Sequence, residues 1–166
     1  RYVRKDGSIC WLLWSATPAH KGLIYAVTYD ITDRKAAELE LLDINVAMKN
    51  AVEGIAKIDS DNRYLSVNKS YADLYGYAIE ELILASAEDC TYGEDHGKWQ
   101  RCYKAMLETG KAEVELLGLR KDGTLFHQQL TMVRATELND KFTGYYVFSK
   151  DISARKEVEA SLQQSE

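Results

Sequence analysis

The chain is poor in proline and cysteine, and it has no long apolar run. With one proline in 166 residues, Pro18, it has no proline-rich linker. Its three cysteines, Cys10, Cys90 and Cys102, are odd in number and far apart, which favours free thiols in a reducing compartment over disulfides or a zinc site. No apolar run approaches the roughly 18 residues of a membrane span, and no signal peptide precedes the first predicted strand. We therefore expect a cytoplasmic protein with no membrane segment in this piece.

The chain also has fewer basic than acidic residues. The 26 acidic and 21 basic residues leave a net charge of −5, which argues against a nucleic-acid partner because phosphate binding needs a basic patch. Apolar residues make up 46% and charged residues 28%, the balance of an ordinary globular domain. The length suits one full domain plus a fragment. Because the first residue already lies in a predicted strand, we expect a piece of a larger protein.

Two short motifs each occur twice along the chain. At a spacing of about 120 residues, they are Arg4–Gly7 with Arg120–Gly123, and Asp30–Arg34 with Asp151–Arg155. Each copy predicts a β-hairpin that runs into a helix, with Asp-Gly in a tight turn before the first strand. Thr32 and Ser153 stand where an N-cap hydroxyl is expected. A hairpin buries too little to be stable alone, so residues 1–30 must pack on something, pair with another copy or be poorly ordered.

Residues 33–51 predict a helix with two apolar stripes. One stripe has the spacing of a coiled-coil seam and comprises Ala37, Leu41, Ile44, Met48 and Ala51. The other comprises Leu39, Leu42 and Val46 and fits an amphipathic helix packed on the sheet of its own domain. The second copy favours the seam, because Val158 and Leu162 keep the positions of Ala37 and Leu41 relative to the preceding motif. We expect a linker helix at 33–51 and a second one from 153 to 166. The expected assembly is a parallel homodimer through these helices.

Between the two linker helices the pattern is that of an α+β domain. Strands are predicted at 52–59, 63–67, 114–119, 125–133 and 143–150, with helices between the second and the third strand. Asn68 is the predicted N-cap of the first helix, which ends at Gly76, and the longest helix, 95–109, ends at Gly110. The strand connections inside each group are short, so the sheet should be antiparallel with helices on one face.

With these motifs in place, the chain resembles a PAS domain. The matching residues, in order, are Val52–Ile55 with Asp59, Val67–Tyr71, Leu74–Tyr77 with Glu80–Leu82, Thr109–Gly110, Arg120–Gly123 and Asp151–Lys156. The resemblance implies a five-stranded antiparallel sheet in the order 2-1-5-4-3 over residues 52–152, with helices on one face. Residues 1–32 then resemble the C-terminal hairpin of a preceding, truncated PAS domain, which would make the chain part of a tandem repeat.

The resemblance also implies a sensory role in signal transduction. Such domains occur in tandem upstream of histidine kinase (two-component) or diguanylate cyclase output domains, so neighbouring PAS and output domains are expected as partners. The sequence contains no phosphate loop, nucleophile elbow or catalytic cluster, and we expect no enzyme activity in this piece. Fold alone does not separate a sensor from a ligand-free interaction and dimerisation spacer, and both interpretations stay open.

No cofactor is predicted, and a haem or flavin redox sensor is the weaker alternative. Cys90 lies in Asp89–Tyr92, which departs from the Asn-Cys-Arg-Phe-Leu type motif of flavin-binding light-oxygen-voltage domains, so we interpret it as a small buried thiol. In haem-binding members the axial histidine is on the long helix, at the position of Trp99 here. His96, one turn earlier, is interpreted as a polar surface residue. The three histidines have no metal-ligand spacing.

A small-molecule pocket has two interpretations. Gln128 stands where the first copy has Leu12, and a buried amide needs a partner, which could be a ligand, a water, Asn68 or a tyrosine. Gly118 stands where the first copy has Tyr2, which makes room. The functional interpretation is a ligand cavity lined by Tyr71, Tyr75, Trp99, Tyr103, Leu116 and Gln128. The pattern favours a filled core, because aromatic residues at helical spacing are usually core.

Signal relay is assigned to the second repeated motif. The predicted residues are Asp151, Ser153 and Arg155, with Asp30, Thr32 and Arg34 as their counterparts. One interpretation is a local helix cap with an Asp151–Arg155 salt bridge, which contributes little when exposed. The other is a latch that ties the last strand to the outgoing helix, where a small shift of the sheet becomes a tilt of the helix.

Overall fold

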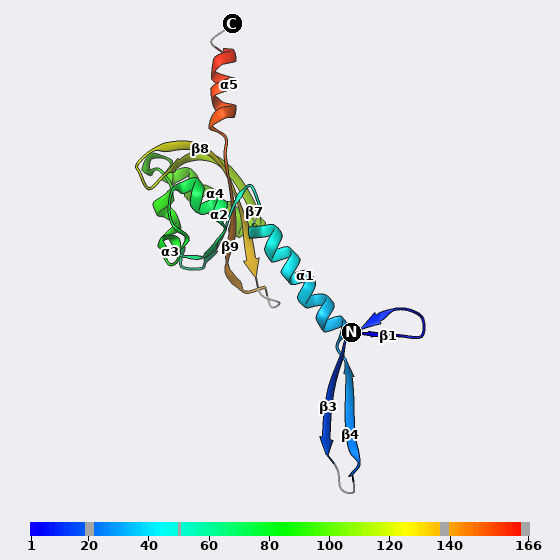
Figure 1. Ribbon diagram of the computed structural model, residues 1–166. Helices are drawn as coiled ribbons and strands as arrows, with labels where there is room; N and C mark the ends of the chain where they lie inside the picture. The colour runs from blue at the N-terminus through cyan, green and yellow to red at the C-terminus, as the bar shows by residue number, and fades with distance from the viewer. Residues whose placement is uncertain (19–21, 50, 137–139, 164–166) are drawn as a thin grey trace. The chain divides into compact units, whose positions relative to one another are not determined.

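The computed structural model describes residues 1–18, 22–49, 51–136 and 140–163. These residues form two compact units, Arg1–Ala47 and Met48–Glu166 (Figure 1). The two repeated hairpins fall one in each unit. Among the described residues, no helix is long and apolar enough to cross a membrane.

The first unit is a hairpin followed by a helix. Its elements are β1 (Tyr2–Val3), β2 (Ile9–Cys10), β3 (Leu12–Pro18), β4 (Ile24–Asp30) and α1 (Thr32–Lys49). β1 pairs with β2, and β3 pairs with β4, both antiparallel. Gly7 has a φ of +83°, so it makes the tight turn that the Asp-Gly pair predicts. β3 extends to Pro18, and residues 19–21 lie outside the described part of the chain.

Helix α1 has no buried residue in its described length. Both apolar stripes reach the surface: Leu41 in the seam is 61% exposed and Leu42 in the other stripe is 57% exposed. α1 therefore has the exposed apolar stripes of a helix that pairs with another surface, and its own unit covers neither stripe.

The predicted end of this helix, at Ala51, is wrong, because α1 ends at Lys49. Side chains of the following domain bind the carbonyls that a longer helix would use. The Asn68 amide donates to the Met48 carbonyl at 3.1 Å and to the Glu53 carbonyl at 3.0 Å, and the Ser70 hydroxyl donates to the Ala51 carbonyl at 2.6 Å. These bonds direct the chain into the first strand of the sheet.

The second unit is an α+β domain built on one five-stranded sheet. Its elements are β5 (Gly54–Asp59), β6 (Tyr64–Val67), α2 (Lys69–Tyr75), α3 (Ile79–Leu82), the 3-10 turns η2 (Ala87–Cys90) and η3 (Gly93–Asp95), α4 (His96–Thr109), β7 (Lys111–Leu119), β8 (Leu125–Thr136), β9 (Phe142–Asp151) and α5 (Ser153–Gln163). The strands run antiparallel in the order β6-β5-β9-β8-β7, which confirms the predicted order 2-1-5-4-3. Helices α2 and α4 pack against one face of the sheet (Figure 1).

Local sequence signals set the ends of the helices as predicted. The Asn68 side-chain oxygen accepts from the Tyr71 amide at 2.9 Å, which caps α2, and it also accepts from the Ile55 amide at 2.8 Å. Gly76 ends α2 in the left-handed region at φ +75°, and Gly110 ends α4 at φ +86°. Asn68 thus joins the first strand of the sheet to the first helix that covers it.

The core between the sheet and the helices is rich in tyrosine. Tyr64, Tyr71, Tyr75 and Tyr145 are each at most 2% exposed. Strands β8 and β9 direct every second residue into this core, as the period of a half-buried strand requires. Large aromatic side chains contribute much of the apolar area that folding buries, so these four residues hold the sheet and helices together.

Candidate functional site

The junction between β9 and α5 is held by hydrogen bonds to the neighbouring strand. The Asp151 carboxylate accepts from the Ser153 amide at 2.8 Å and from Arg120 Nη2 at 3.0 Å. The Ser153 hydroxyl accepts from the His127 amide at 3.1 Å, and the Ile152 amide donates to the His127 carbonyl at 2.9 Å. Ile152 itself is buried. The helix therefore begins while the chain is still bonded to the sheet.

The hydroxyl at this junction does not cap the helix, so that prediction is wrong. Ser153 and its counterpart Thr32 are the first residues of α5 and α1, one position too late for an N-cap. Their hydroxyls accept instead from the strand amides of His127 and Trp11. Each side chain thus links the sheet to the helix.

A second set of contacts holds the first turn of α5 to β7. Glu115 binds both Arg155 and Lys156, the latter at 2.7 Å. Hydrogen bonds from Lys156 and Arg155 hold the pKa of the Glu115 carboxyl below its usual value. The predicted Asp151–Arg155 salt bridge is wrong: Asp151 pairs with Arg120, because the start of α5 turns Arg155 toward β7. The latch stays a prediction, with Arg120 and Glu115 as the contacts that it would use.

The first copy repeats the main hydrogen bonds of the junction. The Asp30 carboxylate accepts from the Thr32 amide at 2.9 Å and from Arg4 Nη2 at 2.5 Å. The Ile31 amide donates to the Trp11 carbonyl at 2.8 Å. Arg34 pairs with Glu38 at 3.1 Å, four residues on, as Arg155 pairs with Glu159. Three of the predicted relay residues, Asp30, Thr32 and Arg34, therefore occupy the same local positions as Asp151, Ser153 and Arg155.

A buried polar cluster lies on the inner face of the sheet. Tyr75 and Ser149 hydroxyls both donate to Gln128 Oε1, at 2.5 Å and 2.8 Å, so the partner of the buried amide is a tyrosine together with a serine. Among the described residues, Gln128 Nε2 has no hydrogen-bond partner. Buried polar atoms of this kind are uncommon. Tyr71 extends the cluster, since its ring centroid lies 4.7 Å from that of Tyr75 and its hydroxyl is 2.8 Å from that of Tyr64.

The six predicted pocket residues fall into two groups. Tyr71, Tyr75 and Gln128 belong to the buried polar cluster, and Leu116 pairs with Gln128 across β7 and β8. Trp99 and Tyr103 stack on each other with ring centroids 5.4 Å apart, and Tyr103 meets Tyr145 edge-on. Tyr71, Tyr75, Trp99 and Leu116 belong to the hydrophobic core and Tyr103 packs against it, so both the ligand cavity and the filled core stay open as interpretations.

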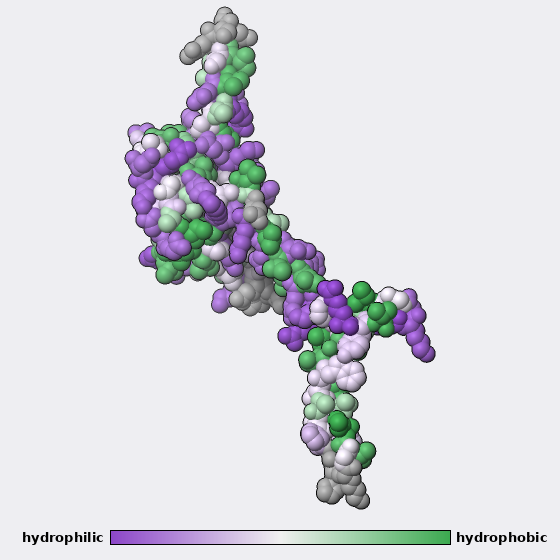
Figure 2. Space-filling model, viewed as in Figure 1, coloured by the Kyte–Doolittle hydropathy of each residue, from purple (hydrophilic) through white to green (hydrophobic). Residues whose placement is uncertain are grey.

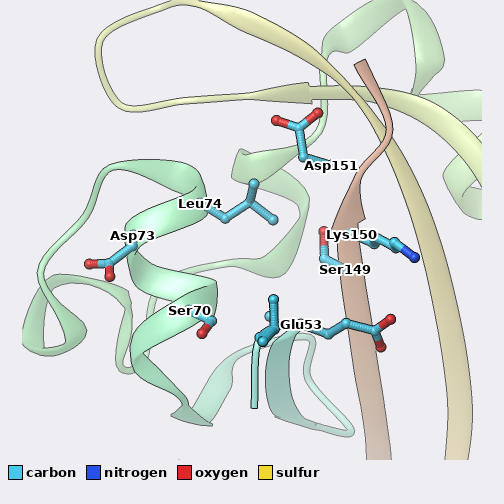
Figure 3. A pocket seen from close by; sticks show the side chains of 9 residues that line it. Glu53, Ser70, Asp73, Leu74, Ser149, Lys150 and Asp151 are labelled. Carbon is cyan, nitrogen blue, oxygen red and sulfur yellow. The ribbon is translucent and has the colours of Figure 1, made fainter. Parts of the chain in front are cut away.

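A surface groove opens between α2 and β9, beside the junction. It encloses about 620 Å³ and is lined by Val52, Glu53, Gly54, Ser70, Asp73, Leu74, Ser149, Lys150 and Asp151. Figure 3 shows Leu74 and Ser149 facing each other across it, while Asp73 and Lys150 point away. Through Ser149 the groove adjoins the buried polar cluster, and through Asp151 it adjoins the junction. Sequence reasoning missed this groove, because its walls come from three distant segments.

The residues considered for haem and flavin occupy structural positions. Cys90 is 3% exposed, as predicted, and burial raises the pKa of its thiol to about 11. His96 Nε2 lies 3.2 Å from Glu88 Oε2, and the imidazole ring stacks on the ring of Trp99. Within the described ranges, no group of three or more His, Cys, Asp or Glu side chains could hold a metal ion.

The buried thiols predict how stability depends on pH. Burial raises the pKa of Cys90 and of Cys102 to about 11, from an ordinary value of 9.0. Between these values the unfolded chain loses thiol protons that the folded chain keeps, so stability is full below about pH 9 and falls as the pH rises toward 11. Urea unfolding at pH 8, 9 and 10 should show this fall, and Cys90→Ala should reduce its slope. If stability falls equally steeply with pH in Cys90→Ala and in the unmodified protein, the raised pKa of the Cys90 thiol is contradicted.

Comparison with known proteins agrees with this fold. Residues 52–154 match the sequence profile of the PAS domain. A PAS domain from Colwellia psychrerythraea superposes with a TM-score of 0.66 at 22% identity, covering 69% of this chain and 98% of that one. A PAS domain of a two-component sensor histidine kinase gives 0.59 at 16% identity, with coverages of 69% and 98%. An RNA-binding light-oxygen-voltage receptor gives 0.68 at 18% identity, covering 94% of this chain and 42% of that one. No curated protein matches the chain.

The sheet order and the span of the profile match define the class of protein: an α+β domain of the PAS type, which occupies most of the second unit. The chain belongs to the PAS domain family.

Proposed function

We propose that this chain is a sensory or regulatory PAS module of a signalling protein, which passes changes in the sheet through β9 into α5. The observation that carries the proposal is the junction itself. One residue, Asp151, joins the end of β9 to Arg120 and to the first amide of α5. A shift of β9 along its neighbour therefore moves the origin of the helix. The superposition with a PAS domain from a two-component sensor histidine kinase supports a role in signalling.

The repeated junction supports the same function for the first copy. Identical bonds at Asp30 and Thr32 join the β3–β4 hairpin to α1. In both copies the helix starts at the same position relative to the end of the preceding strand. This arrangement suits a chain that passes a signal from the first copy to the second. Nothing in this arrangement needs catalysis by the PAS region, so enzyme activity, where present, would lie in another domain of the parent protein.

Removing the salt bridges between Glu115 on β7 and the first turn of α5 should loosen the start of that helix. We expect Glu115→Gln to speed hydrogen exchange of the amides in the first two turns of α5 by about two- to fivefold, because it removes the charge that holds Arg155 and Lys156. Glu113→Gln, two residues earlier on the same strand, is the matched control: Glu113 binds Gln129 and Thr131 rather than α5. Equal exchange in α5 for both variants would count against the relay.

Homodimerisation through the linker helices is part of the proposal. The seam of α1 is exposed, and its spacing of four and three residues suits knobs-into-holes packing with a second copy. Light scattering over a dilution series should show a dimer that dissociates on dilution. Leu41→Gln with Ile44→Gln should shift this equilibrium to monomer, while Leu39→Gln with Leu42→Gln on the other stripe should not. The reverse result would favour an amphipathic helix packed on a sheet.

A second candidate function, sensing of a small molecule, has one observation in its favour. Gln128 is buried, yet its Nε2 has no partner among the described residues, and an amide donor in that position suits a ligand carbonyl. Native mass spectrometry of the gently purified protein tests this idea. A co-purified metabolite that is lost in Gln128→Leu would establish it. If the purified protein shows no added mass, the conformational relay remains the proposed function.

A further inference from the structure

The first hairpin has the strand register of the second. Tyr2 pairs with Cys10 as Gly118 pairs with Phe126, and Leu12 pairs with Asp30 as Gln128 pairs with Asp151. The turns agree as well. In each copy the Asp of Asp-Gly accepts from the amide two residues on, Ser8 or Thr124, at 2.9 Å. Each paired strand residue of the first hairpin therefore has a counterpart in a completed PAS sheet.

The counterparts differ sharply in burial. Trp14 and Ile24 are 53% and 71% exposed, whereas Leu130 and Tyr145, at the same positions of the second copy, are 3% and 0% exposed. We call this surface the inner face of the first hairpin: Leu12, Trp14 and Ala16 of β3 with Ile24 and Ala26 of β4. Hydrophobic residues are visible along the hairpin in Figure 2. A face of this composition is usually covered by a partner.

Side-chain volumes also match those of a core. The second pair from the turn holds one aromatic and one small residue in each copy, but on opposite strands: Tyr2 with Cys10, and Gly118 with Phe126. A β-carbon on Gly118 would come within 2.4 Å of the Phe126 ring, so this position admits only one large partner. Both copies thus place one large side chain opposite a small one, which avoids two large side chains in one place, as a packed interior requires.

The second copy also shows what covers such a face. β5 pairs with the free edge of β9, from Gly144 to Ser149, and α2 and α4 supply the apolar layer above. By the repeat, the corresponding edge of the first hairpin is residues 23–28 of the β4 segment. We infer that the inner face of the first hairpin belongs to a second PAS core, and that its partner is the segment of the parent polypeptide before Arg1. That segment supplies a strand antiparallel to β4 and an apolar helical layer.

Cysteine labelling tests this assignment with a matched pair of positions. Ala16→Cys lies on the inner face, where its counterpart Met132 is fully buried, and Ser15→Cys lies on the opposite face, where its counterpart Thr131 is half-buried. Maleimide labelling is followed by peptide mass mapping, so Cys10, Cys90 and Cys102 are read separately. Unchanged protection of Cys90 and Cys102 verifies that each variant is folded.

In the 166-residue chain we expect both introduced thiols to react quickly. In the parent polypeptide extended before Arg1 by one PAS length, Ala16→Cys should react at least about tenfold more slowly while Ser15→Cys keeps its rate. Equal rates at both positions in the extended protein would overturn the assignment. So would protection of Ala16→Cys in the 166-residue chain that grows with concentration, since the cover would then be a second copy. The test does not depend on signal relay.

Discussion

Gly144→Ala should lower the free energy of unfolding of the PAS domain by about 3 kcal/mol, the largest effect expected from any single methyl group here. Gly144 pairs with Asp59 where β9 meets β5, at a φ of +134°. A β-carbon there would lie 2.0 Å from the Ile58 carbonyl oxygen and 2.9 Å from the Asp59 Cα. Both are backbone atoms, so relief requires the two strands to separate.

Two other glycines divide this effect into its causes. Gly123, at φ +84°, has open space around it, so Gly123→Ala should cost only the left-handed backbone penalty of about 1 kcal/mol. Gly93 has open space and no positive φ, so Gly93→Ala should change stability by less than about 0.5 kcal/mol. Urea unfolding of the three variants gives the comparison. A Gly144 variant no less stable than the Gly123 variant would show that β5 and β9 are not joined as described.

The pair formed by Gly118 and Phe126 should show strong coupling. Gly118→Ala alone should cost about 2 kcal/mol through its clash with the ring, and Phe126→Cys alone about 3 kcal/mol through the cavity it leaves. In the double variant, which takes the first copy's small residue at position 126, the clash with the ring disappears and only the 2.8 Å approach to Gln128 Nε2 remains. The combined cost should therefore fall short of the sum by at least about 1 kcal/mol.

Additivity elsewhere is the control for this coupling. Ile58 lies on β5, separated from β7 by β9 and β8, so Gly118→Ala with Ile58→Val should give the sum of the single effects. An additive result for Gly118 with Phe126 would contradict both the packing of this pair and the volume argument for the first hairpin.

Much of the fold follows from local sequence signals together with the family resemblance. Asn68, Gly76 and Gly110 mark helix ends because an N-cap oxygen and left-handed glycines act within a few residues. The strand order 2-1-5-4-3 came from the resemblance, since alternation alone does not say which strands are neighbours. The end of α1 was missed because the bonds that stop it come from Asn68 and Ser70, well along the chain.

The site was only partly predictable for the same reason. Asp151 and Ser153 were found from the repeat, but their partners are 31 and 26 residues away: Arg120 in the turn between β7 and β8, and His127 on β8. The repeat did contain one signal for the first partner: Arg4 and Arg120 precede the Asp-Gly turn at the same distance in both copies. Glu115 lies 40 residues before Arg155, and only the pairing of the strands brings the two side chains together.

The central claim is that a change inside the sheet reaches α5 through β9. Ser149→Ala tests it most directly, because Ser149 lies on β9 and its hydroxyl bonds to Gln128 and Tyr75 in the buried polar cluster. We expect hydrogen exchange of the Ser153 and Lys156 amides to change by about twofold or more, while Thr131→Ala on the outer face of β8 leaves them unchanged. Exchange rates and chemical shifts throughout α5 that are identical in Ser149→Ala and the unmodified protein would contradict the account.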